Sequence, residues 1–489
     1  MKRLFCLPVY ILFLGVCAAT ARADLTANIR SLLGDKVLSK DQVGVVVVYL
    51  GNAEGSDRQI FEYKSTTPRI PASNLKLITT AAAINQLGAG FQFKTTLAAR
   101  GPDIAIIGDG DPTLGDAELL KKLGWGTDTV FKAWAEMLRQ RGIVHVRDVY
   151  VDDSIFEQNF AHPNWSADQA HKRYQAQVAG LNFNANCLDF YLRTTGQNQV
   201  VDFRVDPPTH FAAIANDCIT GGRNAVWLSR QLGSNSIVLR GETNVSNDVP
   251  VSVTIDDPPM FAGTFFAETL EANGISVTGK VERDRTIRAA IASKGPATNP
   301  AGAWVPAAIH TTPLSTVLAR ANKDSMNLYA ESMCKRVGAS TTGQPGSWEN
   351  GTAAVGDMLK KLGIPSTEFN LDDGCGLSKK NNISPNAVVR VLEHQFHSKD
   401  WPVYLASLSV GGMDGTLENR FRDSDLKGRV FGKSGYVAGV RSLSGYVKTR
   451  DSQWFAFSIL MNNLGEGEAQ AKVIQERIVQ AVDADSAHK

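Results

Sequence analysis

Residues 43–50 read VGVVVVYL, an apolar, mostly β-branched run that ends at Gly51. A short run of this kind, apolar at nearly every position, predicts a strand in the middle of a sheet. A helical apolar stripe over residues 25–33 precedes it, and a second strand is expected near residues 60–63. The chain therefore begins with a helix followed by part of a sheet.

The C-terminal part of the chain has a matching texture. Residues 440–447 alternate apolar and polar side chains, a turn follows at residues 450–452, and an apolar run covers residues 454–461. This order predicts a β-hairpin, and the apolar spacing over residues 473–482 predicts a helix after it. Because strands and helices of like character stand at both ends, we expect one α/β domain built from both ends of the chain.

The region between these ends has a different texture, with short β-like runs separated by turn residues and by two Pro-Pro pairs that we interpret as joints. We expect residues 24–90 and 300–489 to form the α/β domain and residues 91–299 to be a β-rich insertion. The insertion is expected to hold two subdomains, the second covering roughly residues 182–255.

The N-terminus has the features of a secretory signal peptide. A charged start is followed by an apolar run over residues 4–19 and by small residues that end at Ala23. We expect residues 1–23 to be removed after Ala23 and the protein to be exported. The apolar run is shorter than the about 20 residues that a transmembrane helix needs, and no later run approaches that length, so no transmembrane segment is predicted.

Composition excludes several function classes. The chain has 489 residues, of which 43% are hydrophobic and 20% charged, as in ordinary globular proteins. Loss of residues 1–23 removes Lys2, Arg3 and Arg22, which leaves 48 basic residues against 49 acidic ones. No dense block of Lys and Arg remains to neutralise a row of phosphates, so nucleic acid is not an expected partner.

The predicted mature chain keeps four cysteines: Cys187, Cys218, Cys334 and Cys375. An even number in an oxidising compartment favours disulfides, and a bond between Cys187 and Cys218 would stabilise the fold by ~3 kcal/mol. Four free, buried thiols are the alternative. No cysteine or histidine spacing is typical of a metal site, so neither a metal nor another cofactor is expected.

Residues 73–76 (SNLK) place a hydroxyl and an amine three residues apart at the start of a helix predicted to run to about residue 86. Positions i and i+3 share one helix face, so Lys76 can reach Ser73. A serine hydroxyl needs a base to become a good nucleophile, and a buried lysine whose pKa falls from about 10.4 towards 7–8 can serve. Taken alone, the spacing also fits a capping serine beside an unrelated surface lysine.

Two further motifs follow along the chain. Residues 325–327 (SMN), just ahead of a predicted helix, offer a second hydroxyl and an amide. Residues 433–435 (KSG), at the head of the predicted hairpin, offer a cation, a hydroxyl and a glycine beside which a substrate backbone can lie. The order S-x-x-K, S-x-N, K-[TS]-G is the motif set of penicillin-binding proteins and class A β-lactamases.

With these motifs the chain resembles the S13 peptidases, which are D-alanyl-D-alanine carboxypeptidase/endopeptidases of the class C low-molecular-mass penicillin-binding proteins. Ser325 follows Ser73 by 252 residues, and this family places a large insertion in that gap whereas a compact β-lactamase does not. Residues 108–114 (GDGDPTL), 322–331 (NKDSMNLYAE) and 412–417 (GMDGTL) are also similar to family motifs. The resemblance implies an α/β fold, a penicillin-binding transpeptidase/β-lactamase-like domain with an antiparallel sheet flanked by helices, interrupted by the β-rich insertion.

The resemblance also implies roles for the first two motifs. Ser73 would attack the carbonyl of the penultimate D-alanine, and Lys76 would take its proton. Terminal D-alanine would leave, and water would hydrolyse the acyl-enzyme. Ser325 would relay a proton to the leaving amine, and Asn327 would hold the amide on the acyl side. β-Lactams would acylate Ser73 because they resemble the D-Ala-D-Ala terminus.

The third motif would bind the end of the substrate. Lys433 and Ser434 would hold its C-terminal carboxylate, and Gly435 would let the substrate backbone lie close. The backbone N–H groups of Ser73 and Tyr436 would form the oxyanion hole. The family's usual K-T-G is K-S-G in this chain, which keeps the hydroxyl and loses a methyl group that restrains its rotamer.

Two other segments matter through the resemblance. Trp165, Asp168 and Tyr174 belong to a stretch similar to one that lines the cleft for the diamino acid side chain of the peptide, although both aromatic residues also fit a role in the core of the insertion. Residues 373–378 read DGCGLS where the family usually has DGSGLS. Cys375 either pairs with Cys334 or is a thiol near the cleft.

The expected function is that of a periplasmic serine D-Ala-D-Ala carboxypeptidase/DD-endopeptidase acting on peptidoglycan stem peptides or their cross-links. One alternative is a serine β-lactamase, but no E-x-x-L-N-like segment between the second and third motifs supplies a water-activating glutamate. The other is a non-catalytic peptidoglycan-binding scaffold. A scaffold has no physical need for a lysine in a costly buried site, so retention of Lys76 beside Ser73 argues against it.

Overall fold

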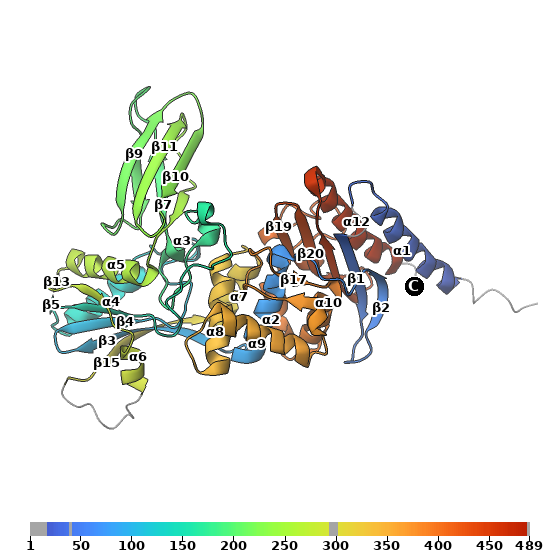
Figure 1. Ribbon diagram of the computed structural model, residues 1–489, viewed down its shortest axis with the longest axis horizontal. Coiled ribbons are helices and arrows are strands. Elements are labelled where there is room, and N and C mark those ends of the chain that lie inside the picture. Colours follow the sequence, from blue (N-terminus) through green and yellow to red (C-terminus); the bar gives the residue numbers. More distant parts are fainter. Residues whose placement is uncertain (1–16, 39–41, 293–301, 487–489) are drawn as a thin grey trace, which may run out of the picture. The chain divides into compact units, whose positions relative to one another are not determined.

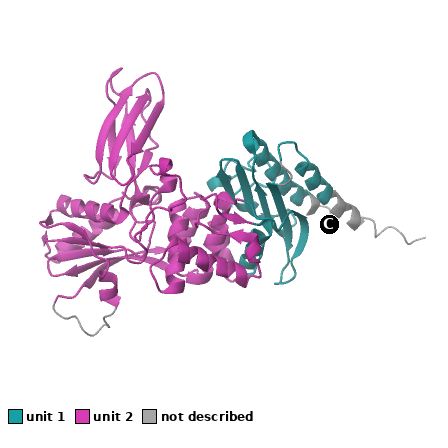
Figure 2. Cartoon of the chain, in the orientation of Figure 1, with its two compact units in different colours: residues 1–69, 384–397, 409–489 teal, residues 70–383, 398–408 magenta. Residues whose placement is uncertain are grey.

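The computed structural model describes residues 17–38, 42–292 and 302–486 (Figure 1). Two compact units make up the chain (Figure 2). Unit 1 consists of residues 1–69, 384–397 and 409–489, and unit 2 consists of residues 70–383 and 398–408. Each unit therefore combines segments that lie far apart in the sequence. The domain boundaries at residues 91 and 299 stay a prediction.

Unit 1 is built on a six-stranded sheet with the strand order β18-β19-β20-β21-β1-β2, in which all neighbours pair antiparallel. Its strands are β1 (Val43–Leu50), β2 (Arg58–Tyr63), β18 (Ser409–Val410), β19 (Val430–Val437), β20 (Val440–Lys448) and β21 (Trp454–Met461). The run at residues 43–50 thus forms an interior strand between β21 and β2, as predicted. The predicted C-terminal hairpin is confirmed as β20 and β21.

The described residues of unit 1 also form the α-helices α1 (Cys17–Leu33), α10 (Pro385–His397) and α12 (Glu468–Ser486). Ile29 of α1 and Ile478 of α12 pack in one buried cluster with Val45 and Val47 of β1. The alternate residue Val46 is buried as well and points to the opposite face, because side chains alternate along a strand. Burial of both faces of β1 explains why its sequence is apolar throughout.

Unit 2 contains the helices α2 (Leu75–Leu87), α7 (Leu314–Asn322), α8 (Asn327–Thr342), α9 (Trp348–Lys361) and α11 (Trp401–Ser407). Every residue of α2 from Leu75 to Ile84 is buried, because α7, α8, α9 and α11 all pack against it. A helix enclosed in this way is apolar all round apart from residues with a buried partner. Lys76 is such a residue, and its surroundings are described below.

The remainder of unit 2 is mainly β-structure. A five-stranded mixed sheet has the order β14-β6-β4-β3-β15, and two three-stranded sheets have the orders β12-β7-β8 and β10-β11-β9. The strands are β3 (Gln92–Arg100), β4 (Asp103–Ile107), β5 (His145–Val146), β6 (Val149–Asp152), β7 (Cys187–Arg193), β8 (Asp202–Asp206), β9 (Ala213–Thr220), β10 (Ala225–Arg230), β11 (Ser236–Thr243), β12 (Val251–Thr254), β13 (Ser276–Val277), β14 (Val281–Arg283), β15 (Val305–Pro313), β16 (Phe369–Asn370) and β17 (Asn382–Ile383). Because β3 pairs with β15, the start of the predicted insertion lies beside a strand that follows its predicted end at residue 299.

The residues predicted to be an insertion also form the helices α3 (Ala117–Lys121), α4 (Thr129–Gln140), α5 (Pro258–Ala272) and α6 (Ile287–Ala292). Phe131 of α4 stacks on Phe183 with 5.0 Å between ring centroids and also contacts Phe266 of α5, so these helices form part of the core of this region. The second of the two Pro-Pro pairs, Pro258 and Pro259, lies at the start of α5, and its interpretation as a joint stays a prediction. Proline fits the first helical position because its missing N–H would have no partner there, and Asp257 caps the helix.

The expectation of disulfides is wrong, because Cys187, Cys218, Cys334 and Cys375 are all free and buried. Burial raises the pKa of the Cys187 thiol to about 12, as expected for a thiol in an apolar interior. The predicted signal peptide lies mostly outside the described residues. Among the residues described, no helix has both the length and the apolar composition of a membrane span.

Candidate active site

Ser73 lies in a single 3-10 turn, Ala72–Asn74, that leads directly into α2. Ala72 has a φ of 47°, a left-handed conformation that costs a non-glycine residue about 1–3 kcal/mol and is concentrated at functional sites. A loop formed by residues 373–378 lies against this turn, and a Cβ at Gly376 would come within 1.9 Å of the Ala72 carbonyl oxygen. The surroundings thus fix the backbone on the N-terminal side of Ser73.

Lys76 is fully buried, and its amine has three hydrogen-bond partners. Nζ lies 3.0 Å from Ser73 Oγ, 2.7 Å from Asn327 Oδ1 and 3.0 Å from the carbonyl oxygen of Cys375. Asn327 Nδ2 donates to the Tyr174 carbonyl oxygen at 2.8 Å, so the amide oxygen must face Lys76. Two of the three partners are therefore obligate acceptors, whereas the Ser73 hydroxyl can accept or donate.

This arrangement determines where a neutral Lys76 directs its lone pair. A neutral amine has two protons, and the two obligate acceptors, Asn327 Oδ1 and the Cys375 carbonyl, take both of them. The lone pair then faces the hydroxyl of Ser73, which becomes the donor. A lysine held in this way is placed to accept the proton of Ser73.

The electrostatic surroundings of Lys76 favour that neutral form. Burial lowers the pKa of Lys76, and Cys375, Glu331 and Asp373 oppose the shift without cancelling it. The cause is desolvation, which penalises an ammonium in a low-dielectric interior.

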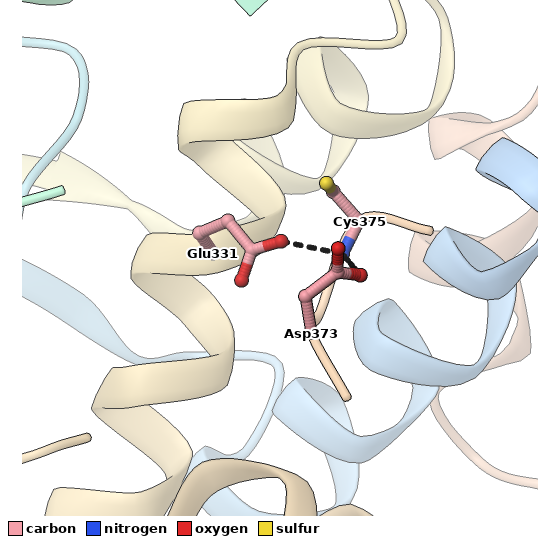
Figure 3. Close-up of side chains that lie close together, drawn as sticks. All are labelled: Glu331, Asp373 and Cys375. Carbon is pink, nitrogen blue, oxygen red and sulfur yellow. Dashed lines mark hydrogen bonds between the residues drawn. The ribbon is translucent and has the colours of Figure 1, made fainter. Parts of the chain in front are cut away.

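The loop that carries Cys375 is anchored by two buried carboxylates. Glu331, on α8, accepts a hydrogen bond from the backbone N–H group of Gly374 at 2.9 Å. It accepts another from the backbone N–H group of Cys375 at 2.7 Å (Figure 3). Asp373 accepts from the backbone N–H groups of Gly376 and Ser378 at 2.6 and 2.7 Å. These contacts hold the loop in one conformation.

Glu331, Asp373 and Cys375 place three potential metal-ligating atoms within 4.8 Å of one another. The carboxylate oxygens already accept N–H donors, including Trp348 Nε1 at 2.8 Å from Glu331 and Trp165 Nε1 at 3.0 Å from Asp373. Donors aimed at these oxygens from several sides suit an anchor for the loop and do not fit a cation.

Ser325 precedes Asn327 by two residues in the sequence. Its φ of 58° is left-handed and strained for a serine. Among the described residues, none forms a hydrogen bond with its hydroxyl, so the structure does not join Ser325 to Ser73 or Lys76 directly. Met326, which follows it, caps α8 in an extended conformation, and Asn327 is the first residue of that helix.

The segment of the insertion that contains Trp165, Asp168 and Tyr174 reaches this site. Trp165 is half-buried and bonds to Asp373, as described above, while the Tyr174 carbonyl holds Asn327. The Tyr174 ring is 43% exposed, so it is not part of the core of the insertion. Asp168 is exposed and accepts a hydrogen bond from Ser166.

The third motif belongs to unit 1, on β19. Lys433 is fully buried, and its Nζ donates to the carbonyl oxygen of Ser434 at 2.8 Å. Gly435 is buried, and Tyr436 is 54% exposed with the Arg441 guanidinium 3.9 Å from its ring centroid. The motif therefore combines a buried cation with an exposed aromatic ring on one strand.

Comparison with known proteins connects these features to a family. The model of the D-Ala-D-Ala carboxypeptidase 3 (S13) family matches residues 25–484. The chain belongs to this family. The resemblance seen in the sequence is thereby confirmed, and the S13 chain is a serine-type peptidase.

Individual relatives agree with this assignment. A D-alanyl-D-alanine carboxypeptidase of Actinomadura sp. (strain R39) is 31% identical over 469 residues, covering 90% of the S13 chain and 81% of the relative. The crystal structure of penicillin binding protein 4 from Haemophilus influenzae matches with a TM-score of 0.74 at 22% identity, covering 94% of this chain and 99% of the other. A complex of that protein with a β-lactam matches with a TM-score of 0.68, at 22% identity and the same coverage. The predicted fold class is confirmed.

Sequence reasoning did not identify several groups of this site in the S13 chain. Glu331 ends the family-like motif at residues 322–331, and Asp373 begins the stretch at residues 373–378 that differs from the family's usual sequence. Neither motif predicted a role for these two carboxylates. The carbonyl groups of Tyr174 and Cys375 are backbone atoms, which no side-chain motif marks. For Glu331 the available signal was a carboxylate among the mostly apolar residues 328–334.

Proposed function

We propose that the protein is a periplasmic D-alanyl-D-alanine carboxypeptidase/endopeptidase that cleaves peptidoglycan stem peptides or their cross-links through an acyl-enzyme on Ser73. The observation that carries the proposal is the placement of Lys76, which is fully buried, bound to two obligate acceptors and 3.0 Å from Ser73 Oγ. The family and the name of the Actinomadura relative support D-alanyl-D-alanine as the substrate class.

In the first step, Lys76 accepts the hydroxyl proton of Ser73 while Oγ attacks the carbonyl carbon of the penultimate D-alanine. The negative charge that develops on the carbonyl oxygen is stabilised by the backbone N–H groups of Ser73 and Tyr436. The C–N bond then breaks, and the leaving amine takes a proton that passes from Lys76 by way of Ser325. An ester on Ser73 remains.

In the second step, a water molecule attacks the ester and regenerates the Ser73 hydroxyl.

Lys433 and Ser434 bind the terminal carboxylate of the substrate, and Gly435 lets its backbone lie along β19. Asn327 holds the acyl-side amide. Trp165, Asp168 and Tyr174 contact the diamino acid side chain. The positions of Trp165 beside Asp373 and of Tyr174 beside Asn327 support this part of the proposal.

β-Lactams acylate the same serine, since their ring amide resembles the D-Ala-D-Ala terminus. The complex of Haemophilus influenzae penicillin binding protein 4 with a β-lactam supports this part of the proposal by showing that a protein of this fold binds such a compound. A serine β-lactamase would instead hydrolyse the acyl-enzyme quickly, and a non-catalytic scaffold would form none.

The test is the intact mass of the protein after brief exposure to benzylpenicillin. We expect one drug molecule added to the wild type and none added to Ser73→Ala. Ser332→Ala is the matched control, because it removes another hydroxyl, buried on α8 and without a partner, and should leave the adduct unchanged. Release of D-alanine from a D-Ala-D-Ala peptide should follow the same order.

Three results would contradict the proposal. Release of D-alanine by Ser73→Ala at the wild-type rate would exclude the acyl-enzyme on this residue. Rapid hydrolysis of benzylpenicillin without an adduct would favour a β-lactamase, and an intact drug without an adduct would favour a scaffold.

A further inference from the structure

Glu331 is a fully buried carboxylate that takes no part in the steps above, yet it is bound tightly to the loop that contacts Lys76. Its Oε1 accepts the N–H of Cys375 at 2.7 Å, and its Oε2 accepts the N–H of Gly374 at 2.9 Å and Trp348 Nε1 at 2.8 Å. Cys375 therefore connects the two residues: its N–H donates to Glu331, and its carbonyl oxygen accepts a hydrogen bond from Lys76.

The loop has little freedom to adjust if this anchor changes. A Cβ at Gly374 would lie 2.6 Å from Cys334 Cβ and 3.1 Å from Glu331 Oε2. Thr79 Oγ1, from α2, donates to the Gly374 carbonyl oxygen at 2.6 Å. The loop is therefore fixed between α2 and α8, and the Glu331 carboxylate is the group on α8 that receives its N–H groups.

We propose that Glu331 is a positioning residue, whose carboxylate fixes the Cys375 carbonyl as an acceptor for Lys76 and supplies part of the negative charge that Lys76 faces. The proposal rests on the proposed role of Lys76 as the base for Ser73. If one of the two obligate acceptors moves, the lone pair of a neutral Lys76 is no longer directed at Ser73 Oγ.

Glu331 affects Lys76 through its charge as well as through its position. Burial, followed by the Asp373 carboxylate, raises the pKa of Glu331 to about 7, against the hydrogen bonds that it accepts. Above about pH 7, where Glu331 is mostly ionised, its charge favours the ammonium form of Lys76, so loss of that charge should let Lys76 lose its proton at lower pH. The titratable groups that face Glu331 are Lys76 from α2, Asp373 and Cys375 from the loop, and Cys334 and Lys335 from α8.

The experiment measures the rate of acylation by benzylpenicillin between about pH 5 and about pH 9 in the full-length mature protein. Glu331→Gln keeps the shape of the side chain, removes its charge and places an amide N–H₂ where one N–H donor now points. We expect a lower plateau rate and an acid limb displaced to lower pH by about one unit, the lower end of the range for a nearby charge.

Two further variants separate position from charge. Glu331→Asp keeps the charge and withdraws the oxygens by one methylene, so its plateau should fall at least about tenfold with less displacement of the acid limb than in Glu331→Gln. Glu157→Gln is the control, because Glu157 is a carboxylate 3.5 Å from Lys335 that does not contact the loop. Its profile should match the wild type.

The proposal is overturned if Glu331→Gln lowers the plateau while leaving the acid limb in place, which is the result of a purely structural role. It is also overturned if Glu331→Asp, which decides the matter should Glu331→Gln fail to fold, is acylated at the wild-type rate. Absence of acylation in the wild type would instead contradict the proposed function, so the two failures are distinguishable.

Discussion

Asn327→Asp tests the arrangement around Lys76 most directly, because it adds a charge with almost no change in shape. Asn327 Oδ1 lies 2.7 Å from Lys76 Nζ, and two unit charges at that separation attract by about 6 kcal/mol at an effective dielectric constant of about 20. Desolvation offsets much of this attraction, and an adjacent opposite charge shifts a pKa by about 1–3 units in practice. We therefore expect the pKa of Lys76 to rise by about 1–3 units.

Since Lys76 must be neutral to accept the proton of Ser73, each unit costs a factor of about ten in rate below that pKa. Acylation of Asn327→Asp by benzylpenicillin at neutral pH should thus be about 10- to 1,000-fold slower than in the wild type, and the deficit should shrink as the pH rises. The measurement is the rate of adduct formation, followed by quenching and intact mass at a series of pH values.

Asn327→Ala is the control for this experiment. It also loses the contact with the Tyr174 carbonyl but adds no charge, and the missing hydrogen bond to Lys76 is worth about 1.5–3 kcal/mol. Its rate should fall to a similar extent at neutral pH without recovering at high pH. If the acid limb of Asn327→Asp coincides with that of the wild type, Lys76 is not the group that accepts the proton.

Two predictions concern stability, measured as the free energy of unfolding in urea. Gly376→Ala should destabilise the protein by more than about 3 kcal/mol, because φ is 85° and the new Cβ would lie 1.9 Å from the Ala72 carbonyl oxygen. Gly363→Ala is the control, with φ at 76° and open space around it, and should cost only about 1 kcal/mol. Equal losses of stability in the two variants would contradict the predicted clash. Arg320→Met should cost about 3–5 kcal/mol, because it leaves the buried Asp116 carboxylate, now 2.8 Å from the guanidinium, without its cation. Burial acts to raise the pKa of Asp116, but Arg320 outweighs burial and the net pKa is lowered. The stability contributed by this ion pair should therefore be present above about pH 4 in the wild type and be lost as the pH falls through the lowered pKa. A wild-type free energy of unfolding that does not change over that range would refute this prediction.

Sequence patterns predicted the sheet of unit 1 because its signals are local. The apolar run at residues 43–50 and the alternation at 440–447 each correspond to a single strand. The helix α4 in the insertion was missed, although Phe131, Trp134 and Leu138 follow helical spacing and are buried. Short β-like runs on either side of that segment drew the interpretation towards strands alone.

In the candidate site, too, contacts between residues close in the sequence could be predicted, and contacts between distant residues could not. Ser73 and Lys76 are three residues apart on adjoining turns, so local helix geometry was enough to predict their contact. The Cys375 carbonyl meets Lys76 across 299 residues of sequence, and any residue type offers a carbonyl, so no pattern could identify it. The expected disulfides were wrong because the number of cysteines constrains neither their distance nor their orientation.

The hydrogen bond from Asn327 to the Tyr174 carbonyl has a consequence for how such proteins can be altered. It means that the segment predicted to be an insertion supplies a structural component of the site, in the form of the Tyr174 carbonyl. An excised version, closed across the adjacent β3 and β15 ends, would keep Ser73, Lys76 and Asn327 but lose the acceptor that orients the amide. Shortened or chimaeric forms would need a replacement for that single carbonyl before the remaining residues could work together.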